Sequence, residues 1–298
     1  MINILQYRKL SAIVSLTILL AAGVLFVYRM QTRGYAFTYS VDFTGGTQIL
    51  LKFNKDTTAS DINSALNEEW PNAVLRQFEK DEYLVRVKEF SNDPQGLSAR
   101  MVDAIKKAHP DYEITVLENE AVGAGVGQTL RYKSLMAIFY ALLAMLGYIA
   151  VRFWSIGFAV GSVVALIHDA LIMLAVFLIF GREISTNVIA AVLAVLGYSI
   201  NDTIVIYSQI RENLKTLNRS SIYDIVNISL NQTMRRTLLT SISTGLTVGA
   251  MFVLGGEALR SFSLALLIGI VFGTYSSIFI ASPIVMFFYR NKDKTVLQ

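Results

Sequence analysis

Three ionisable residues lie inside otherwise apolar segments, and they are the residues of this chain that could do chemistry. Asp202 follows Asn201 in one such segment, Asp169 follows His168 in another, and Arg236 stands at the start of a third. A charged side chain is costly within a membrane, so by default it marks an ion or proton pathway there. A carboxylate whose pKa changes as an arginine approaches or withdraws can take up and release a proton. Asp202 and Arg236 are therefore candidates for a proton relay, and Asp169 is a further candidate.

Each of these residues also has a structural interpretation. Arg236 could be an interfacial anchor, and composition alone favours neither this role nor pairing with an aspartate. An Asp–Arg pair could equally be a static lock, and His168 could be a packing residue as readily as a proton carrier. An anchoring role does not suit Asp202, because the residues that anchor helices at the interface are basic or aromatic. The coupling ion could be a proton or sodium, since both are compatible with an aspartate among threonine and asparagine oxygens.

Hydroxyl groups recur along the segment around Arg236. Their spacings of four, three, four and three residues place them on one helix face: Thr233, Thr237, Thr240, Thr244 and Thr247. We expect this face to hold water and a counter-charge. A loop at residues 209–235 is predicted to join this helix to the preceding one, so Asp202 and Arg236 should lie at a similar depth near the inner side.

Apolar stretches long enough to cross a membrane must position these residues. The chain has 298 residues, of which 54% are apolar and 16% charged, whereas about a quarter are charged in a soluble domain. A bilayer core of about 30 Å requires roughly 20 apolar residues in a helix. Six stretches meet this length: 10–28, 134–151, 156–180, 186–208, 237–255 and 261–289. The first is too long for the apolar core of a cleaved signal peptide, so we interpret it as a span.

The distribution of Lys and Arg predicts the orientation. With the N-terminus in the cytoplasm, 11 basic residues flank the spans inside and two lie in short outer loops: Arg8, Lys9, Arg152, Arg211, Lys215, Arg219, Arg235, Arg236, Arg290, Lys292 and Lys294, against Arg182 and Arg260. Arg29 and Arg33, just outside the first span, oppose this trend. We therefore expect cytoplasmic termini and three parts: 1–33 with the first span, an external domain at 34–133, and a five-helix bundle with a cytoplasmic tail at 134–298.

The external segment reads as a small α+β domain. Strands are predicted at 48–53, 73–78, 83–87 and 112–117, and helices at 58–69 and 97–108, with Thr58 or Ser60 as a cap. This β-α-β-β-α-β order is the ferredoxin-like plan. His109 has no second histidine or cysteine nearby, so we expect a solvated helix end there and no catalytic site. A domain of this kind is suited to contact with macromolecules.

Three glycine pairs with GxxxG spacing suggest close helix packing, and Pro283 should bend the last helix. The pairs are Gly157 with Gly161, Gly245 with Gly249, and Gly269 with Gly273.

Several function classes are excluded by composition. The net charge of +4 lies in loops beside apolar runs, where it sets orientation and does not indicate nucleic-acid binding. The glycines at 123–127 lack the Lys-Ser/Thr of a nucleotide-binding loop, so the energy source must be ionic or supplied by a partner. The chain has no cysteine and therefore no thiol chemistry. We expect neither an enzyme nor a cofactor or metal, apart from a coupling ion, for which a proton is the first expectation.

Five motifs occur in order along the chain. They are Val41-Asp42-Phe43-Thr44-Gly45-Gly46-Thr47 after the first span, Val122-Gly123 with Val126-Gly127, His168-Asp169, the segment 197–205 containing Asn201-Asp202-Thr203, and Arg235-Arg236-Thr237 followed by Thr240-Ser241. Together they resemble the signatures of the SecD/SecF family, within the RND superfamily, and the similarity extends along nearly the whole chain. Ala124 stands where the family often has proline, and the turn at 154–156 is less charged than is usual.

The resemblance implies a polytopic membrane protein with six transmembrane helices and a ferredoxin-like periplasmic domain between the first two. It implies a subunit of the Sec preprotein translocase in the bacterial inner membrane, which uses the proton-motive force after the SecA-driven step. The implied partners are SecD, the SecY-SecE-SecG channel, SecA, preproteins and lipid, with no nucleic acid. Asp202 and Arg236 match the family's relay positions, and Asp169 is a further candidate. The motif residues carried over are Asp42, Phe43, Thr44, Gly45, Gly46, Asn201 and Thr203.

Two other functions are compatible with parts of this pattern. An RND-type exporter of small molecules or lipids would be proton-coupled too, but an external domain of about a hundred residues leaves little room for a substrate cleft. A passive scaffold would not need Asp169 and Asp202 inside its spans.

Overall fold

The structure, a computed structural model, describes residues 1–79, 81–91, 93–217 and 220–289. It divides into two compact units, one formed by residues 1–38 and 135–298 and the other by residues 39–134. The expected cytoplasmic tail after residue 289 lies outside the described residues, as does the predicted inner residue Arg219.

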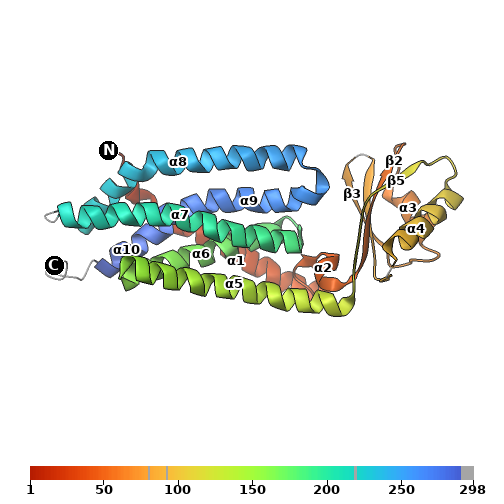
Figure 1. Ribbon diagram of the computed structural model, residues 1–298, viewed down its shortest axis with the longest axis horizontal. Coiled ribbons are helices and arrows are strands. Elements are labelled where there is room, and N and C mark those ends of the chain that lie inside the picture. Colours follow the sequence, from red (N-terminus) through yellow and green to blue (C-terminus); the bar gives the residue numbers. More distant parts are fainter. Residues whose placement is uncertain (80, 92, 218–219, 290–298) are drawn as a thin grey trace. The chain divides into compact units, whose positions relative to one another are not determined.

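The first unit is a bundle of long helices (Figure 1). Over the described residues, six helices are long and apolar enough to cross a membrane, which confirms the predicted spans. The first span consists of a short helix, η1 (Leu5–Tyr7), followed by α1 (Arg8–Arg33). The next four spans are α5 (Ala124–Phe153), α6 (Ile156–Ile179), α7 (Thr186–Thr216) and α8 (Ile222–Leu254). The sixth span begins as α9 (Gly256–Ser276) and continues through a π-helix, η2 (Ser277–Ala281), into α10 (Ser282–Tyr289).

The helices α7 and α8 extend beyond the predicted apolar spans. The loop expected at residues 209–235 is mostly helical, because α7 continues to Thr216 and α8 begins at Ile222. Asn213 of α7 donates hydrogen bonds to Ser229 and Gln232 of α8, at 2.8 and 2.7 Å, and so holds the two extensions together. Arg236 therefore lies in the interior of α8 and not at its inner end.

Glycine permits close packing between α7 and α9. A Cβ placed on Gly269 would overlap Val195 Cγ2, and one on Gly273 would lie 3.0 Å from Ser199 Cβ. The second glycine pair behaves similarly, since a Cβ on Gly157 would lie 2.9 Å from Phe288 Cβ. These contacts agree with the expectation that small residues let helices approach.

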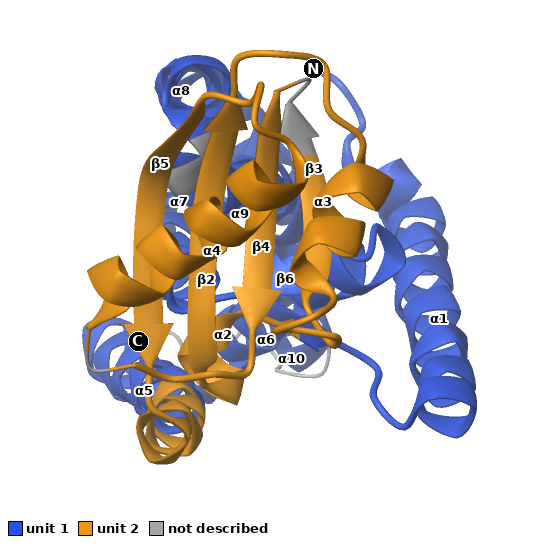
Figure 2. Ribbon diagram, turned by 90° about the vertical axis from the view of Figure 1, so that its right-hand side faces the viewer, with its two compact units in different colours: residues 1–38, 135–298 blue, residues 39–134 orange. Residues whose placement is uncertain are grey.

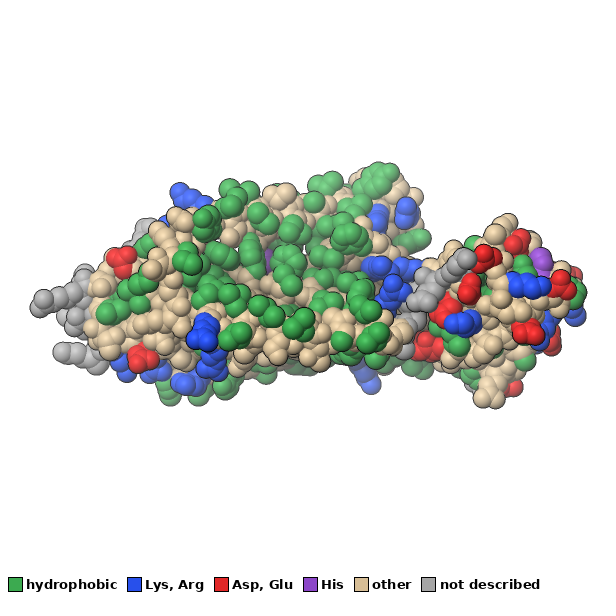
Figure 3. Space-filling model, turned by 90° about the horizontal axis from the view of Figure 1, so that it is seen from above, with side chains coloured by type: hydrophobic (Ala, Val, Ile, Leu, Met, Phe, Trp, Pro, Cys, Tyr) green, Lys and Arg blue, Asp and Glu red, His purple; other side chains and the backbone are tan. Residues whose placement is uncertain are grey.

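The third glycine pair does not pack against another helix among the described residues. A Cβ on Gly245 or on Gly249 would meet no atom of the described chain within 4 Å, apart from the nearby backbone of its own helix. Large apolar side chains such as Leu246 and Val253 of α8 are also exposed, at 70% and 76%. Hydrophobic side chains likewise cover the visible face of the helical unit in Figure 3. Such a surface suits lipid or another apolar partner.

Arg29, a basic residue on the predicted outer side, has a hydrogen-bond partner that explains its position. Its Nη1 donates to the Leu178 carbonyl oxygen near the end of α6, at 2.8 Å. The carbonyl groups at a helix C-terminus carry partial negative charge and lack partners within the helix, so a cation there is favourable.

The last span departs from regular α-helix on the N-terminal side of Pro283. The π-helix η2 interrupts the hydrogen-bond pattern before α10 begins at Ser282. Ser282 Oγ donates to the Ser277 carbonyl oxygen at 2.9 Å, and Tyr207 of α7 donates to the Ala281 carbonyl oxygen at 3.1 Å. The irregular turn is therefore held by side-chain hydrogen bonds.

The second unit has the predicted β-α-β-β-α-β order. It consists of β2 (Gly46–Phe53), α3 (Ala59–Leu66), β3 (Val74–Glu79), β4 (Glu82–Val87), α4 (Pro94–Ala108) and β5 (Ile114–Val122), preceded by α2 (Val41–Thr44). Its antiparallel sheet has the order β3-β4-β2-β5. Figure 2 shows α3 and α4 across one face of this sheet. Two short strands, β1 (Thr38–Tyr39) and β6 (Glu183–Ile184), complete the chain's elements.

The helices of this unit begin at well-formed caps. Thr58 caps α3, as predicted: its Oγ1 accepts from the Asp61 N–H at 3.3 Å and donates to Asp61 Oδ2 at 2.7 Å. Asp93 caps α4 with Pro94 at its first turn, which starts that helix three residues before the predicted Leu97. The core between helices and sheet contains the buried side chains Ile49, Leu51, Phe53, Ile62, Leu66, Val85, Leu97, Met101 and Ile105.

Candidate functional site

Asp202 lies at the meeting point of three helices. Its side chain is buried, and Ser241 of α8 donates to Asp202 Oδ2 at 3.4 Å. The Ser241 hydroxyl also contacts Thr274 Oγ1 of α9 at 2.7 Å and Tyr198 OH of α7 at 3.4 Å. The carboxyl group is thus held in a small cluster of hydroxyls inside the bundle.

Arg236 lies near Asp202 without forming an ion pair with it. Within the described part of the chain, no ion pair of 4 Å or less joins the two side chains. Arg236 is exposed and lines a cavity of about 440 Å³ between α7 and α8, to which Ile204 and Val205 also contribute. Other side chains that line this cavity are Asn201, Ser208, Gln209, Glu212 and Gln232. Asp202 itself is not among the residues that line this cavity.

The threonine face of α8 differs from the expected water-holding stripe. Thr233, Thr240 and Thr247 each donate to the carbonyl oxygen four residues earlier in α8, at 2.9, 3.1 and 3.2 Å. Such back-bonding satisfies the hydroxyls within their own helix. Thr237 Oγ1 is different, because it is a buried polar atom without a hydrogen-bond partner among the described residues.

Asp169 occupies a second, fully buried position. Its exposure is 0%, and its Oδ2 accepts from Ser199 of α7 at 2.7 Å and from Ser276 of α9 at 2.9 Å. Its Oδ1 lies 3.2 Å from His168 Nδ1. Three polar groups therefore surround this carboxyl group, as burial of an acid requires.

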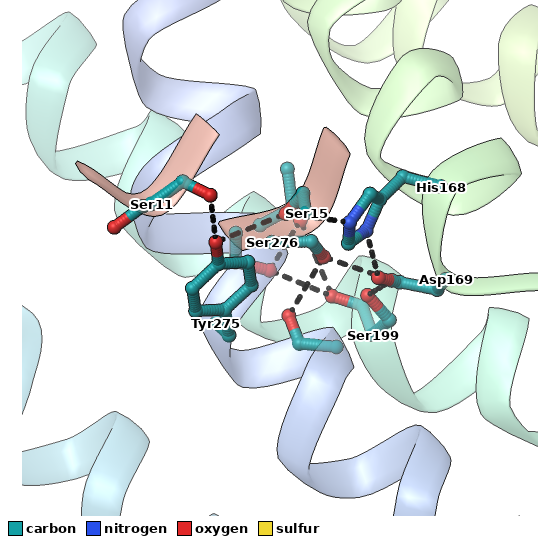
Figure 4. A network of polar contacts seen from close by, with 10 residues as sticks. Ser11, Ser15, His168, Asp169, Ser199, Tyr275 and Ser276 are labelled. Atoms are coloured by element: carbon teal, nitrogen blue, oxygen red, sulfur yellow. Dashed lines mark hydrogen bonds and ion pairs between the residues drawn. The ribbon is translucent and has the colours of Figure 1, made fainter. Parts of the chain in front are cut away.

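His168 connects Asp169 to the first span (Figure 4). His168 Nε2 lies 3.0 Å from Ser15 Oγ of α1, and this Ser15 hydroxyl lies 3.0 Å from Tyr275 OH of α9. Tyr275 in turn donates to the Ser11 carbonyl oxygen, one turn earlier in α1. The histidine ring also stacks against the Tyr275 ring, with centroids 6.1 Å apart.

Four consecutive residues of the last span reach all of these groups. Thr274 contacts the Asp202 cluster, Tyr275 contacts α1, and Ser276 contacts Asp169. Ser277 Oγ lies 2.8 Å from Thr203 Oγ1 of α7. Sequence reasoning missed these partners, although two signals were available: a polar run inside an apolar span, and serines four residues apart at 11 and 15.

The motif that follows the first span has a structural role within the α+β unit. Gly45 and Gly46 have φ values of 74° and 112°, which favour glycine, and they lead from α2 into β2. A Cβ on Gly45 would lie 2.6 Å from Ala124 Cα, and one on Gly127 would lie 3.1 Å from Gly45 N. Gly45 and Gly127 therefore allow the start of α5 to pack against the turn, and the expected turn at Gly45-Gly46 is present.

Over the residues that the structure describes, no group of three or more His, Cys, Asp or Glu side chains is arranged to hold a metal. The site offers two separate acids among hydroxyl oxygens. Acids held in this way can bind and release a proton.

Family models and known proteins match this arrangement. The model for the protein export membrane protein SecD/SecF C-terminal region matches residues 101–291, and that for the SecD/SecF GG motif matches residues 36–57. The chain is 38% identical to protein translocase subunit SecF of Calditerrivibrio nitroreducens, covering 89% of this chain and 88% of that one.

A longer relative matches through one part of its length. The chain is 37% identical to protein translocase subunit SecDF of Thermus thermophilus, covering 96% of this chain but 38% of that one. The crystal structure of SecDF, described as a translocon-associated membrane protein, superposes with a TM-score of 0.84 at 35% identity, over 98% of this chain and 39% of that one.

Proposed function

This chain belongs to the SecD/SecF family of protein-export membrane proteins, and we propose that it couples ion movement through its bundle to preprotein translocation. It is a multi-pass membrane protein of the translocase-subunit type. The observation that carries the coupling proposal is the burial of Asp202 at 3% exposure inside a span, next to a cavity that Arg236 lines. A buried acid of this kind is expensive and by default functional.

The geometry suggests how protonation would produce movement. An ionised Asp202 attracts the Arg236 guanidinium, whereas a neutral Asp202 does not. Proton binding and release would therefore change the force between α7 and α8, and the absence of a fixed ion pair leaves the arginine able to respond. A charge crossing the membrane is worth about 2.3 kcal/mol per 100 mV, enough to bias such a cycle.

The proposed setting follows the family and the relatives. We place the chain in the bacterial inner membrane with cytoplasmic termini and the α+β unit, residues 39–134, in the periplasm. A SecD subunit is the expected partner, because the Thermus relative that matches this chain over 38% of its length is named SecDF. SecY-SecE-SecG, SecA and a translocating preprotein would complete the assembly, and the α+β unit would contact the preprotein.

Translocation of a preprotein into inverted membrane vesicles tests this function. Asp202→Asn keeps the shape of the side chain but fixes it as neutral, so the gradient-stimulated part of translocation should be lost while the subunit still assembles. Arg236→Lys keeps the charge but not the planar fork and should impair coupling. Arg235→Lys, on the adjacent exposed residue, is the matched control and should be silent.

The same assay identifies the ion. A protonophore should remove the stimulation if the ion is a proton, whereas collapse of a sodium gradient should remove it if the ion is sodium. Full gradient stimulation in Asp202→Asn vesicles would contradict the relay and leave Asp202 as a structural residue.

A further inference from the structure

The directions of the hydrogen bonds around His168 are constrained by the number of hydrogens available. A hydroxyl group has one hydrogen to donate. Tyr275 uses its hydrogen on the Ser11 carbonyl oxygen, so in the 3.0 Å contact between Ser15 and Tyr275 the hydrogen must come from Ser15. Ser15 then has none left for His168. Its 3.0 Å contact with His168 Nε2 is a hydrogen bond only if Nε2 carries a hydrogen.

The other ring nitrogen faces Asp169. His168 Nδ1 lies 3.2 Å from Asp169 Oδ1, and this contact too needs one hydrogen between the two atoms. That hydrogen belongs either to an imidazolium beside a carboxylate or to a carboxylic acid beside a neutral ring. In both forms the pair holds one proton more than a neutral histidine and an ionised aspartate would hold.

We propose that His168 and Asp169 form a second proton-binding site, and that its bound proton keeps Tyr275 of α9 attached to α1. Loss of that proton leaves Nε2 as an acceptor, with the remaining hydrogen between Nδ1 and Asp169. Ser15 then turns its hydrogen to Nε2. Tyr275 can now donate to Ser15 or to Ser11, but not to both, so one hydrogen bond between α9 and α1 is lost. Proton binding at this site does not depend on the proposed function; only a role of the site in transport rests on that function.

No other charged side chain is bonded to this network within the described residues. The neighbouring helix α1 contributes Ser11 and Ser15, and the titratable group from α9 is Tyr275. On α7, Asp202 is bonded to Ser241 and not to this network. On α10, Tyr289 is bonded to Ser155. Proton binding at the pair is therefore distinct from proton binding at Asp202.

The histidine content of the chain makes a direct test possible. The sequence has two histidines, and His109 lies in the α+β unit. The full-length His109→Gln protein, labelled with ¹⁵N-histidine and reconstituted in lipid nanodiscs, reports on His168 alone. Its ¹⁵N spectrum should show a protonated Nε2 at low pH and an unprotonated Nε2 above a single midpoint.

Removing the Tyr275 hydroxyl distinguishes a proton-binding site at His168 and Asp169 from a purely structural contact between these residues. Tyr275→Phe abolishes the extra hydrogen bond that favours the proton-bound form, so the midpoint should move to lower pH by about half to one unit. Tyr198→Phe is the matched control, because the Tyr198 hydroxyl contacts Ser241 and not this network. It should leave the midpoint unchanged.

Two results would overturn the inference. One is an Nε2 that stays unprotonated from pH 5 to 9, and the other is a midpoint that Tyr275→Phe does not move. Repeating the titration with Asp202→Asn separates this inference from the proposed function. A Tyr275-dependent midpoint in that background supports the second site even if Asp202 proves irrelevant to transport. A relay at Asp202 without titration of His168 would refute the second site alone.

Discussion

The hydroxyl of Ser241 on α8 lies 3.4 Å from Asp202 Oδ2 on α7. The same hydroxyl is 2.7 Å from Thr274 on α9, so it joins the buried acid to two other helices. Ser241 is thus a direct hydrogen-bond partner of Asp202, whereas Arg236 is not.

Ser241→Ala should weaken coupling without preventing assembly. Loss of one hydrogen bond to the acid should reduce gradient-stimulated translocation into inverted vesicles by about threefold to tenfold. Ser243→Ala, on an exposed residue of the same helix, should have no effect. Equal activity of the Ser241 and Ser243 variants would show that Ser241 does not position Asp202.

Gly269→Ala should destabilise the bundle, because its new Cβ would overlap Val195. Overpacking of this kind costs about 1–3 kcal/mol, which should appear as a lower melting temperature of the purified protein. Val195→Ala should restore most of the loss in the double variant. Gly245→Ala is the control and should not lower the melting temperature, because the new Cβ would meet no other helix of the described chain within 4 Å. If Val195→Ala does not restore the melting temperature of Gly269→Ala, the destabilisation does not come from the overlap with Val195.

The capping box of α3 makes the α+β unit sensitive to acid. Hydrogen bonds from the Thr58 side chain and backbone hold the pKa of Asp61 below its usual range. A lowered pKa stabilises the folded state above the unfolded-state pKa, and this stabilisation is lost as pH falls through the folded-state pKa. A fragment of residues 39–134 should unfold cooperatively, and Asp61→Asn should lower its melting temperature by several degrees at pH 7.

The pH dependence of that difference is the decisive measurement. The gap between Asp61→Asn and wild-type fragments should narrow as the pH falls below about 4, since the wild-type carboxylate is then lost too. Asp103→Asn, on an exposed residue of α4, should change little at either pH. A gap that stays constant down to pH 2 would rule out the charge of Asp61 as its cause.

Single cysteines test the orientation, because the chain has no cysteine of its own. Asp111→Cys in the α+β unit, at a side chain that is 85% exposed, should react with an impermeant maleimide added to cells with a permeabilised outer membrane. Thr216→Cys at the end of α7 should react only after the inner membrane is opened. Labelling of Thr216→Cys from outside would reverse the proposed topology.

Hydropathy alone predicted the six spans, since a bilayer demands long apolar helices whatever their neighbours are. The order of elements in the α+β unit was equally readable from alternating apolar positions and caps such as Thr58. The ends of α7 and α8 were not, because Asn213 and its partners stabilise helix beyond the apolar segments through tertiary hydrogen bonds.

The hydrogen-bond partners of Asp169 and Asp202 could not be predicted from the sequence either. Ser15 and His168 are 153 residues apart in the chain, and no local period connects them. Asp202 was expected to face Arg236 because both are charged and lie on consecutive helices. The structure gives the direct contact to Ser241, a small hydroxyl that has no distinctive signal in a sequence.

The interlocking of Gly269 with Val195, and of Gly273 with Ser199, has a mechanical consequence. The Val195 and Ser199 side chains of α7 fit into the spaces beside Gly269 and Gly273 of α9. If the helices slid along each other, these side chains would collide with the larger neighbours of the glycines. In any conformational change of the bundle, α7 and α9 would therefore move together as one rigid unit. Relative movement would then fall to contacts that can be exchanged at little cost, such as the hydrogen bonds of Tyr275 with α1 and of Ser241 with Asp202.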